Sequence, residues 1–132
     1  MVSVRVYTRL ISTGSNKEGQ IGLGDSVERI NVLDRIKAPP EFTTAKIAKI
    51  FCAPLHSIFI TCDNQIYICG NNGNCRLGLG EKSSDISKKR TATRITEPED
   101  FCREKIAHVA CGENHTLFLT ASGQVWSCGG NQ

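Results

Sequence analysis

Two stretches of this chain are copies of each other, and this repetition limits the folds that the chain can adopt. When the sequence is shifted by 59 residues, residues 36–73 align with residues 95–132, and fourteen of the thirty-eight pairs are identical. The identical pairs include Pro39/Pro98, Phe42/Phe101, Lys46/Lys105, Ile47/Ile106, Ala48/Ala107, Cys52/Cys111, His56/His115, Phe59/Phe118, Thr61/Thr120, Gln65/Gln124, Cys69/Cys128, Gly70/Gly129 and Asn72/Asn131. A repeat period of roughly 50 residues is typical of solenoids and propellers, in which each unit buries its apolar face against its neighbour.

Each copy contains three short β-like segments. They cover residues 46–52, 56–62 and 65–69 in one copy and residues 105–111, 115–120 and 124–128 in the other. These segments are rich in Ile, Phe, Val and Thr and are separated by turn residues, so we expect antiparallel neighbours joined by hairpins. Short stretches such as Val32-Leu33 or Arg94-Ile95-Thr96 could supply a fourth, outer strand, and four strands per unit make one propeller blade.

The predicted fold is therefore all-β: a partial β-propeller of four-stranded antiparallel blades in an incomplete ring. One domain covers residues 1–132, with repeat fragments 1–35, 36–94 and 95–132. An incomplete ring leaves unpaired strand edges, so we expect either a piece of a larger protein, a shortened gene product, or self-association through the open blade edges.

A loop dense in glycine and asparagine follows the third segment, at residues 70–80, and residues 14–24 match it after a shift of 56. Gly and Asn tolerate positive φ, which indicates a tightly folded loop, and we expect Ile21/Leu77 and Leu23/Leu79 to pack it onto the core. Residues 78–83 place Lys-Ser after glycines as a phosphate-binding loop does, but Glu81 stands where that motif needs Gly. We interpret these glycines as architectural and expect no cofactor.

Composition and charge exclude several classes of protein. The chain is 39% hydrophobic with a net charge of +3, which is ordinary for a folded chain and lacks the concentrated positive charge of a nucleic-acid binder. No apolar stretch approaches the roughly 20 residues of a spanning helix, and the N-terminus lacks a signal-peptide pattern. We therefore expect no membrane association, a reducing compartment, and a location in the cytoplasm or nucleus.

The seven cysteines are expected to be free thiols. Cys52/Cys111 and Cys69/Cys128 are repeat equivalents, and with Cys62 they fall on strand-like apolar segments, which favours packing as small hydrophobic side chains. None of the seven forms a Cys-x-x-Cys pair, so a metal site is the weaker alternative.

The units resemble the regulator of chromosome condensation repeats, which build a seven-bladed β-propeller. The residues that carry the resemblance are Val109-Ala110-Cys111-Gly112, Asn114-His115-Thr116-Leu117, Gly123-Gln124-Val125-Trp126 and Cys128-Gly129-Gly130-Asn131 in the last unit, and Gly14, Gly19-Gln20-Ile21-Gly22-Leu23-Gly24 in the first. The middle unit departs from this pattern: Ala53 and Asn64 stand in place of glycines, and Cys75-Arg76 replaces Gly-Gln. We therefore expect its turns to differ from those of the other units.

The repeated histidines, His56 and His115, begin the same apolar segment in each unit. A recurring His of this kind is typical of a buried hydrogen-bonding residue, with a catalytic residue as the alternative, and no local set of nucleophile, base and orienting group is present. We expect no enzyme activity. The cluster Lys88, Lys89, Arg90 with Arg94 beyond is a candidate interaction loop, or else a solvated loop tip.

Three functional hypotheses remain. The first is a protein-interaction scaffold that binds a partner protein through the inter-blade loops, residues 25–34 and 81–94. The second follows from the family resemblance, which implies guanine-nucleotide exchange on, or regulation of, a small GTPase. The third is a propeller joined to other domains, as in ubiquitin ligases, kinases or ciliary GTPase regulators, which residues 22–29 resemble.

Overall fold

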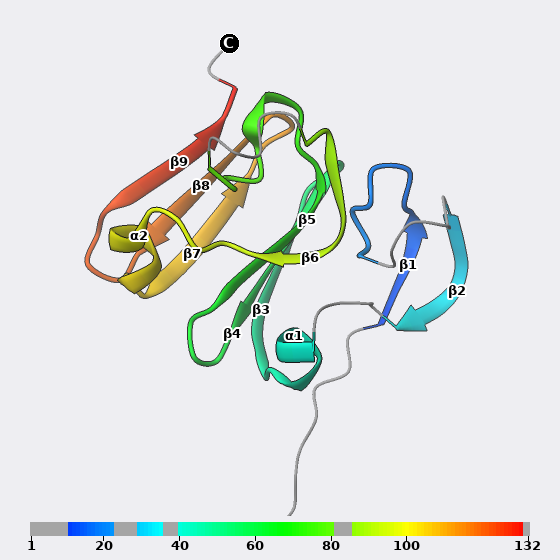
Figure 1. The fold of residues 1–132 in the computed structure, drawn as a ribbon, viewed down its shortest axis with the longest axis horizontal. Helices are drawn as coiled ribbons and strands as arrows, with labels where there is room; N and C mark the ends of the chain where they lie inside the picture. The colour runs from blue at the N-terminus through cyan, green and yellow to red at the C-terminus, as the bar shows by residue number, and fades with distance from the viewer. Residues whose placement is uncertain (1–10, 23–28, 36–39, 81–85, 131–132) are drawn as a thin grey trace, which may run out of the picture.

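Three antiparallel sheets lie side by side in the computed structural model, which describes residues 11–22, 29–35, 40–80 and 86–130 (Figure 1). The first sheet pairs β1 (Ile11–Ser15) with β2 (Arg29–Arg35). The second has the order β3 (Ile47–Cys52), β4 (His56–Thr61), β5 (Ile66–Asn71) and β6 (Lys88–Arg94). The third has the order β7 (Ile106–Cys111), β8 (His115–Thr120) and β9 (Val125–Gly129).

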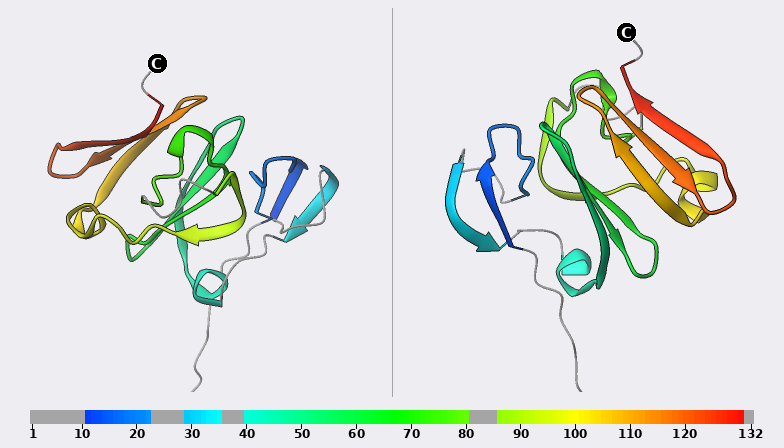
Figure 2. Two further views of the ribbon diagram at one scale, coloured as in Figure 1. Left: turned by 45° about the horizontal axis from the view of Figure 1, so that its top comes forward. Right: turned by 180° about the vertical axis from the view of Figure 1, so that it is seen from behind.

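The predicted architecture of antiparallel, blade-like sheets is confirmed. The strands of each sheet are neighbours in sequence and in space, and β3–β4–β5 repeats as β7–β8–β9. The second sheet lies between the first and the third in each view of Figure 2. We call the sheets, with their following loops, the first, second and third units.

The fourth strand of the second unit begins earlier than the stretch predicted for it. β6 covers Lys88–Arg94, so of residues 94–96 only Arg94 lies in the strand, and Ile95 continues the pairing by donating its N–H to the carbonyl of Ile66 at 2.9 Å. In the first unit Val32-Leu33 lies within β2. Four residues separate Gly24 from β2 and seven separate Gly80 from β6, so the extra three residues of this unit precede the strand. Parts of both predicted interaction loops, residues 25–28 and 81–85, lie outside the described residues.

Two single-turn helices, which no sequence pattern predicted, precede the second and third sheets. α1 (Pro40–Thr44) and α2 (Glu99–Arg103) are too short to show a helical periodicity in sequence. Each carries one of the repeated phenylalanines onto the sheet of its own unit. The ring-centroid distances are Phe42–Phe59 5.4 Å, Phe42–Tyr67 4.8 Å, Phe101–Phe118 5.0 Å and Phe101–Trp126 5.5 Å.

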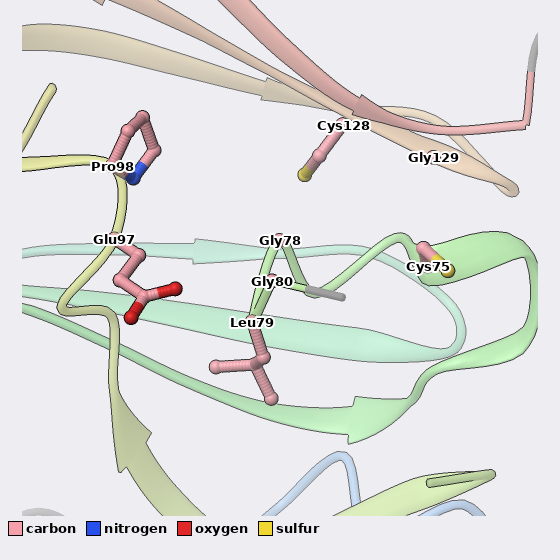
Figure 3. A pocket seen from close by; sticks show the side chains of 8 residues that line it. All are labelled: Cys75, Gly78, Leu79, Gly80, Glu97, Pro98, Cys128 and Gly129. Carbon is pink, nitrogen blue, oxygen red and sulfur yellow. The ribbon is translucent and has the colours of Figure 1, made fainter. Parts of the chain in front are cut away.

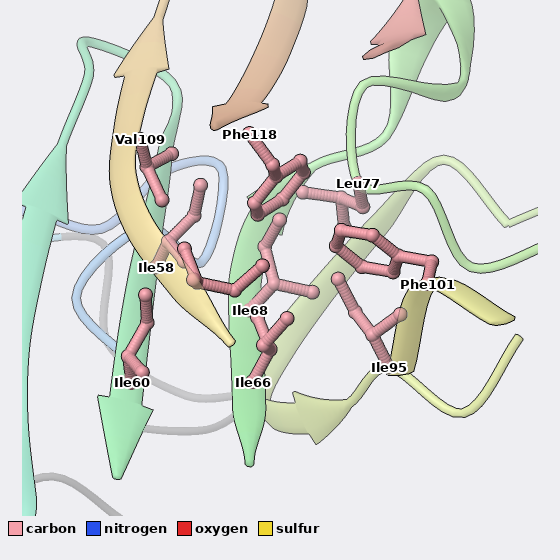
Figure 4. Packing of buried hydrophobic residues seen from close by; sticks show 10 residues of the cluster. Ile58, Ile60, Ile66, Ile68, Leu77, Ile95, Phe101, Val109 and Phe118 are labelled. Atoms are coloured by element: carbon pink, nitrogen blue, oxygen red, sulfur yellow. The ribbon is translucent and has the colours of Figure 1, made fainter. Parts of the chain in front are cut away.

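The main apolar core lies between the second and third sheets (Figure 4). The second sheet contributes Ile58, Ile60, Ile66 and Ile68, and the third sheet, α2 and the loops contribute Ile106, Val109, Phe118, Phe101, Ile95 and Leu77. Leu77 is fully buried, which confirms that the glycine-rich loop is packed onto the core by this residue. Its equivalent Ile21 is half-buried, and Leu23 lies outside the described residues.

Burial follows the position of each sheet in the stack. Every residue of β4 is buried because the second sheet is covered on both faces, whereas β8 alternates between exposed and buried residues. The third sheet therefore exposes Leu117, Leu119 and Val125, at 37%, 41% and 66%. These residues are the repeat equivalents of Ile58, Ile60 and Ile66, which the third unit buries in the second.

Candidate functional site at the seams between units

The same hydrogen-bonded joint closes both seams between adjacent units. At the first seam the backbone carbonyl of Gln20 accepts hydrogen bonds from Ser57 Oγ at 2.6 Å and Cys69 Sγ at 3.5 Å. At the second seam the carbonyl of Arg76 accepts from Thr116 Oγ1 at 3.0 Å and Cys128 Sγ at 3.3 Å. Each residue of the first joint is the repeat equivalent of its counterpart in the second. We call this arrangement the seam joint.

The side chain of the same loop residue reaches across each seam as well. Gln20 Nε2 donates to the carbonyl of Pro54 at 3.3 Å, and Arg76 Nη1 donates to the carbonyl of Glu113 at 2.7 Å. Arg76 also donates through Nε to the carbonyl of Gly73 at 2.8 Å, and it is only 4% exposed. Arg76 therefore performs the role of the glutamine that it replaces, with a longer side chain that binds to an equivalent carbonyl.

Asn64, another departure of the middle unit, also bonds to the next unit. It stands at φ 64°, where its equivalent Gly123 stands at φ 87°, and both turns are closed by matching hydrogen bonds to Thr61 and Thr120. Its side chain donates through Nδ2 to the carbonyl of Glu104 at 2.6 Å and accepts from the backbone N–H of Ile106 at 2.9 Å. The expectation that this turn differs was therefore wrong, because Asn tolerates the left-handed region.

The two repeated histidines have different environments. His56 is fully buried, and its Nε2 lies 2.8 Å from Thr116 Oγ1 in the next unit. Because Thr116 donates its hydroxyl proton to Arg76, His56 must donate Nε2–H, which leaves its buried Nδ1 without a partner in the described structure. Burial, followed by nearby Arg76 and His115, lowers the pKa of His56 from 6.5 to about 4.

The predicted role of a buried hydrogen-bonding residue is confirmed for His56 but not for His115. His115 is exposed, and its ring stands over Gly112, where a Cβ would lie 2.4 Å from Cε1. The equivalent residue in the second unit is Ala53. An imidazole placed like that of His115 would clash with an Ala at this position, so the two histidines cannot share one orientation.

The predicted interaction residues lie on a strand rather than in a loop. Lys88 Nζ donates to the carbonyl of Lys17 at 3.0 Å, and Arg90 Nη1 donates to the carbonyl of Asn16 at 3.5 Å. These two side chains therefore help to join the second unit to the first. Lys89 is half-buried and Arg94 is exposed, and a role of the four residues in partner binding stays a prediction.

Six of the seven cysteines fall into two groups, and the seventh, Cys102, is half-buried. Burial raises the pKa of Cys69 to about 12 and, with neighbouring groups, that of Cys111 and Cys128 to about 11, which fits thiols packed as hydrophobic side chains. Cys52, Cys62 and Cys75 are exposed, so the expectation of packing was wrong for Cys52 and Cys62. Within the described ranges no group of three or more His, Cys, Asp or Glu side chains could hold a metal ion.

A cavity of about 620 Å³, which no sequence motif predicted, lies between the glycine-rich loop of the second unit and β9 (Figure 3). It is lined by Cys75, Gly78, Leu79, Gly80, Glu97, Pro98, Cys128 and Gly129. The side chain of Cys128 points from β9 toward the loop, and the carboxylate of Glu97 faces the loop from the segment before α2. This wall is largely apolar, with one acidic group.

The repeated joints, the blade-like sheets and the glycine-rich loops agree with a family model. Residues 106–132 match the model of the regulator of chromosome condensation (RCC1) repeat. Residues 106–132 are thus an RCC1 repeat. The structure superposes on yeast RCC1 (Prp20), solved bound to Kap60, with a TM-score of 0.75 at 21% identity, covering 92% of this chain and 28% of that one.

Two curated relatives match this chain over only part of their own length. The human X-linked retinitis pigmentosa GTPase regulator is 42% identical over 80 residues, which cover 61% of this chain and 7% of that protein. The human RCC1-like G exchanging factor-like protein is 28% identical over 133 residues, which cover 92% of this chain and 27% of that protein. The chain thus spans about a quarter or less of these relatives. No helix in the described part of the RCC1-repeat structure is long and apolar enough to cross a membrane.

Proposed function

We propose that this chain is a protein-interaction scaffold of RCC1 repeats that binds a partner protein through the connections between its units. The observation that carries the proposal is the seam joint, which occurs in the same form at both seams. Because the repeated polar side chains bond to neighbouring units, they hold the sheets in a fixed relation. Recognition then falls to positions that differ from unit to unit, as is usual for loops on a rigid scaffold.

The turn between the first two strands of each unit offers such positions. Pro54 and Leu55 in the second unit correspond to Glu113 and Asn114 in the third, although the backbone turn is closed in the same way. Glu113 and Asn114 are exposed and border a polar hollow of about 200 Å³ with Asn74, His115 and Gly130. Acidic and amide groups around a hollow suit the basic and polar side chains of a partner protein.

Regulation of a small GTPase is the second candidate function, and the printed names of two relatives favour it. One relative is named a GTPase regulator and the other a G exchanging factor-like protein. An exchange factor must bind the nucleotide-free GTPase more tightly than the nucleotide-bound form, since only this difference in affinity accelerates release. We place the protein in the cytoplasm or nucleus, where such partners occur.

The test is a binding assay of the full chain against a panel of purified small GTPases in the GDP-bound, GTP-analogue-bound and nucleotide-free states. We expect at least one GTPase to bind and the double variant Glu113→Lys/Asn114→Asp to weaken this binding. The control Asp63→Asn, in the turn between β4 and β5 of the second sheet, should leave binding unchanged. Fluorescent-nucleotide release, measured with the same pairs, separates exchange from simple binding. Absence of binding in every state at low salt would count against the GTPase candidate, and absence of any specific cross-linked protein in cell extracts would count against the scaffold.

A further inference from the structure

We propose that Thr91 is a phosphorylation site for a protein kinase that recognises basic segments, and that its phosphate weakens the contact of β6 with the first unit. This site is separate from the turn that carries Glu113, and it does not depend on the proposed function. β6 is the last strand in the order of the second sheet, so its outer edge has no strand partner within the described residues (Figure 1). The Thr91 side chain is exposed on this strand, so a modifying enzyme can approach it from solvent.

Thr91 stands at an irregularity in the pairing of β6 with β5. The register shifts between the pair Ile68/Thr93 and the pair Gly70/Lys89. One residue of β5 therefore stands opposite three residues of β6, and Thr91 is the middle one of the three. Residues in such a bulge lie outside the regular ladder of hydrogen bonds, which is locally disrupted. The backbone at Thr91 is thus extended and only loosely tied to the sheet.

The structure separates Thr91 from the second hydroxyl of the strand, Thr93. Thr93 is half-buried, and its Oγ1 donates to the carbonyl of Thr91 at 3.2 Å. Thr91 Oγ1 makes no hydrogen bond to any part of the chain that the structure describes. Both hydroxyls follow basic residues in the sequence, so the sequence alone does not choose between them. The exposed and unbonded hydroxyl of Thr91 is therefore the acceptor that we infer.

The charge of β6 determines the kind of kinase that fits. Lys88, Lys89 and Arg90 directly precede Thr91, Arg94 follows it, and the strand contains no acidic residue. Kinases select their substrates partly by charge patterns of this kind. An acidic substrate cleft attracts the three preceding cations, since complementary charges speed association and fix the register of the bound segment. The expected enzyme is therefore a basophilic Ser/Thr kinase.

The modification is a phosphoryl transfer from ATP, which the kinase supplies. Oγ1 of Thr91 forms a bond to the γ-phosphorus, and the bond from that phosphorus to the oxygen that bridges it to the β-phosphorus breaks. ADP leaves with the electron pair of the broken bond, and the hydroxyl proton passes to the catalytic base of the kinase. The product carries a charge of about −1.5 to −2 at neutral pH, in the middle of a strand that is otherwise basic.

The phosphate competes for a side chain that joins β6 to the first unit. Arg90 Nη1 donates to the carbonyl of Asn16 at 3.5 Å, which is long for a hydrogen bond, and its Cγ lies against Gly19, where an added Cβ would be 3.0 Å away. A phosphate on the adjacent residue is a charged acceptor, and charge-assisted hydrogen bonds are roughly twice as strong as neutral ones. We expect Arg90 to turn toward the phosphate, which loosens the turn of residues 16–19 from β6.

The experiment treats the full chain with MgATP and the catalytic subunit of cyclic-AMP-dependent protein kinase, used as a basophilic probe. Mass spectrometry of proteolytic fragments locates the phosphate in the wild type, Thr91→Ala, Thr91→Ser and Thr93→Ala. We expect the wild type and Thr93→Ala to take up phosphate at residue 91, Thr91→Ala to lose it, and Thr91→Ser to retain it. Thermal unfolding checks that each variant is folded, as expected for substitutions at an exposed position.

Hydrogen exchange of the phosphorylated chain tests the effect on the first unit. We expect amides of residues 16–22 to exchange roughly twofold to fivefold faster than in the unmodified chain, with the amides of β7 and β8 unchanged. The proposal is overturned if the folded chain takes up no phosphate at Thr91, if the phosphate maps to another hydroxyl, or if Thr91→Ala takes up as much as the wild type. Unchanged exchange at residues 16–22 would overturn the effect on the first unit.

Discussion

The buried imidazole of His56 predicts a specific pH dependence of stability. Its pKa is about 4 in the folded chain and 6.5 when unperturbed. Between these pH values the unfolded chain binds a proton at His56 and the folded chain does not, so the free energy of unfolding falls as the pH is lowered. Well above pH 6.5 the residue is neutral in both states and contributes no pH dependence. Each unit of difference between the two pKa values corresponds to about 1.4 kcal/mol, so the full loss is about 3 kcal/mol.

The matched variants are His56→Gln and His115→Gln. Both remove a histidine from the same repeat position, but only His56 is buried. Urea unfolding between about pH 7.5 and pH 4.5 can be followed through the fluorescence of the single tryptophan, Trp126, which packs on Phe101 beside the core. The comparison of interest is the slope of the unfolding free energy against pH, since carboxylates contribute equally to every variant.

We expect the wild type to lose about 2.5 kcal/mol more than His56→Gln over this range, and His115→Gln to lose nearly as much as the wild type, because His115 makes the smallest of the three contributions that lower the pKa of His56. His56→Gln has a different stability at neutral pH because its hydrogen bond to Thr116 changes, but that offset does not affect the slope. Parallel curves for the wild type and His56→Gln would refute the reasoning, since they would show that the imidazole takes up its proton as readily in the folded chain as in the unfolded one.

Further predictions concern the seam joint and the thiols. Thr116→Val should destabilise the chain by about 2 kcal/mol, because it leaves His56 Nε2–H without an acceptor. The control Thr91→Val, at an exposed position of β6, should change stability by less than about 0.5 kcal/mol, and urea unfolding measures both variants. Arg76→Gln should retain stability within about 1 kcal/mol, whereas Arg76→Ala should lose about 1–3 kcal/mol in thermal or urea unfolding; equal losses would contradict the role of the side chain across the seam. Maleimide labelling followed by mass spectrometry should modify exposed Cys62 well before Cys69, whose pKa is raised to about 12, and simultaneous labelling would contradict the burial of Cys69.

The strands could be predicted from the sequence because the two copies support each other. Turn residues stand at the same offsets in both copies, so the ends of β3, β4, β7 and β8 lie within one residue of the predicted segments. α1 and α2 could not be predicted, because one helical turn has no periodicity and is held by a single aromatic residue that packs on its own sheet. A strand as polar as β6 also escapes a search for apolar runs, since backbone pairing with β5 stabilises it.

The seams required coordinates for a different reason. In the sequence Arg76 differs from the glutamine of the repeat pattern. Its shared role becomes clear only from its hydrogen-bond partner, the carbonyl of Glu113, which lies 37 residues further along the chain. The same holds for Asn64, which bonds to Glu104 and Ile106. A comparison of sequences shows only that the residue type differs from the repeat pattern. The hydrogen bond depends on whether the side chain is long enough to contact the carbonyl of the next unit. The cavity beside β9 could likewise be found only from the structure, because its lining residues come from separate parts of the chain. In the second unit β6 pairs with the equivalent strand, β5.

The atom that receives both hydrogen bonds in each seam joint belongs to the main chain. Gln20 and Arg76 differ in size and charge, yet their peptide oxygens are identical, so a mutation of either side chain leaves this part of the linkage intact. The sequences of neighbouring units can therefore diverge during evolution while the units keep the same orientation relative to each other. Low identity between two such units is then a poor guide to how differently they are arranged.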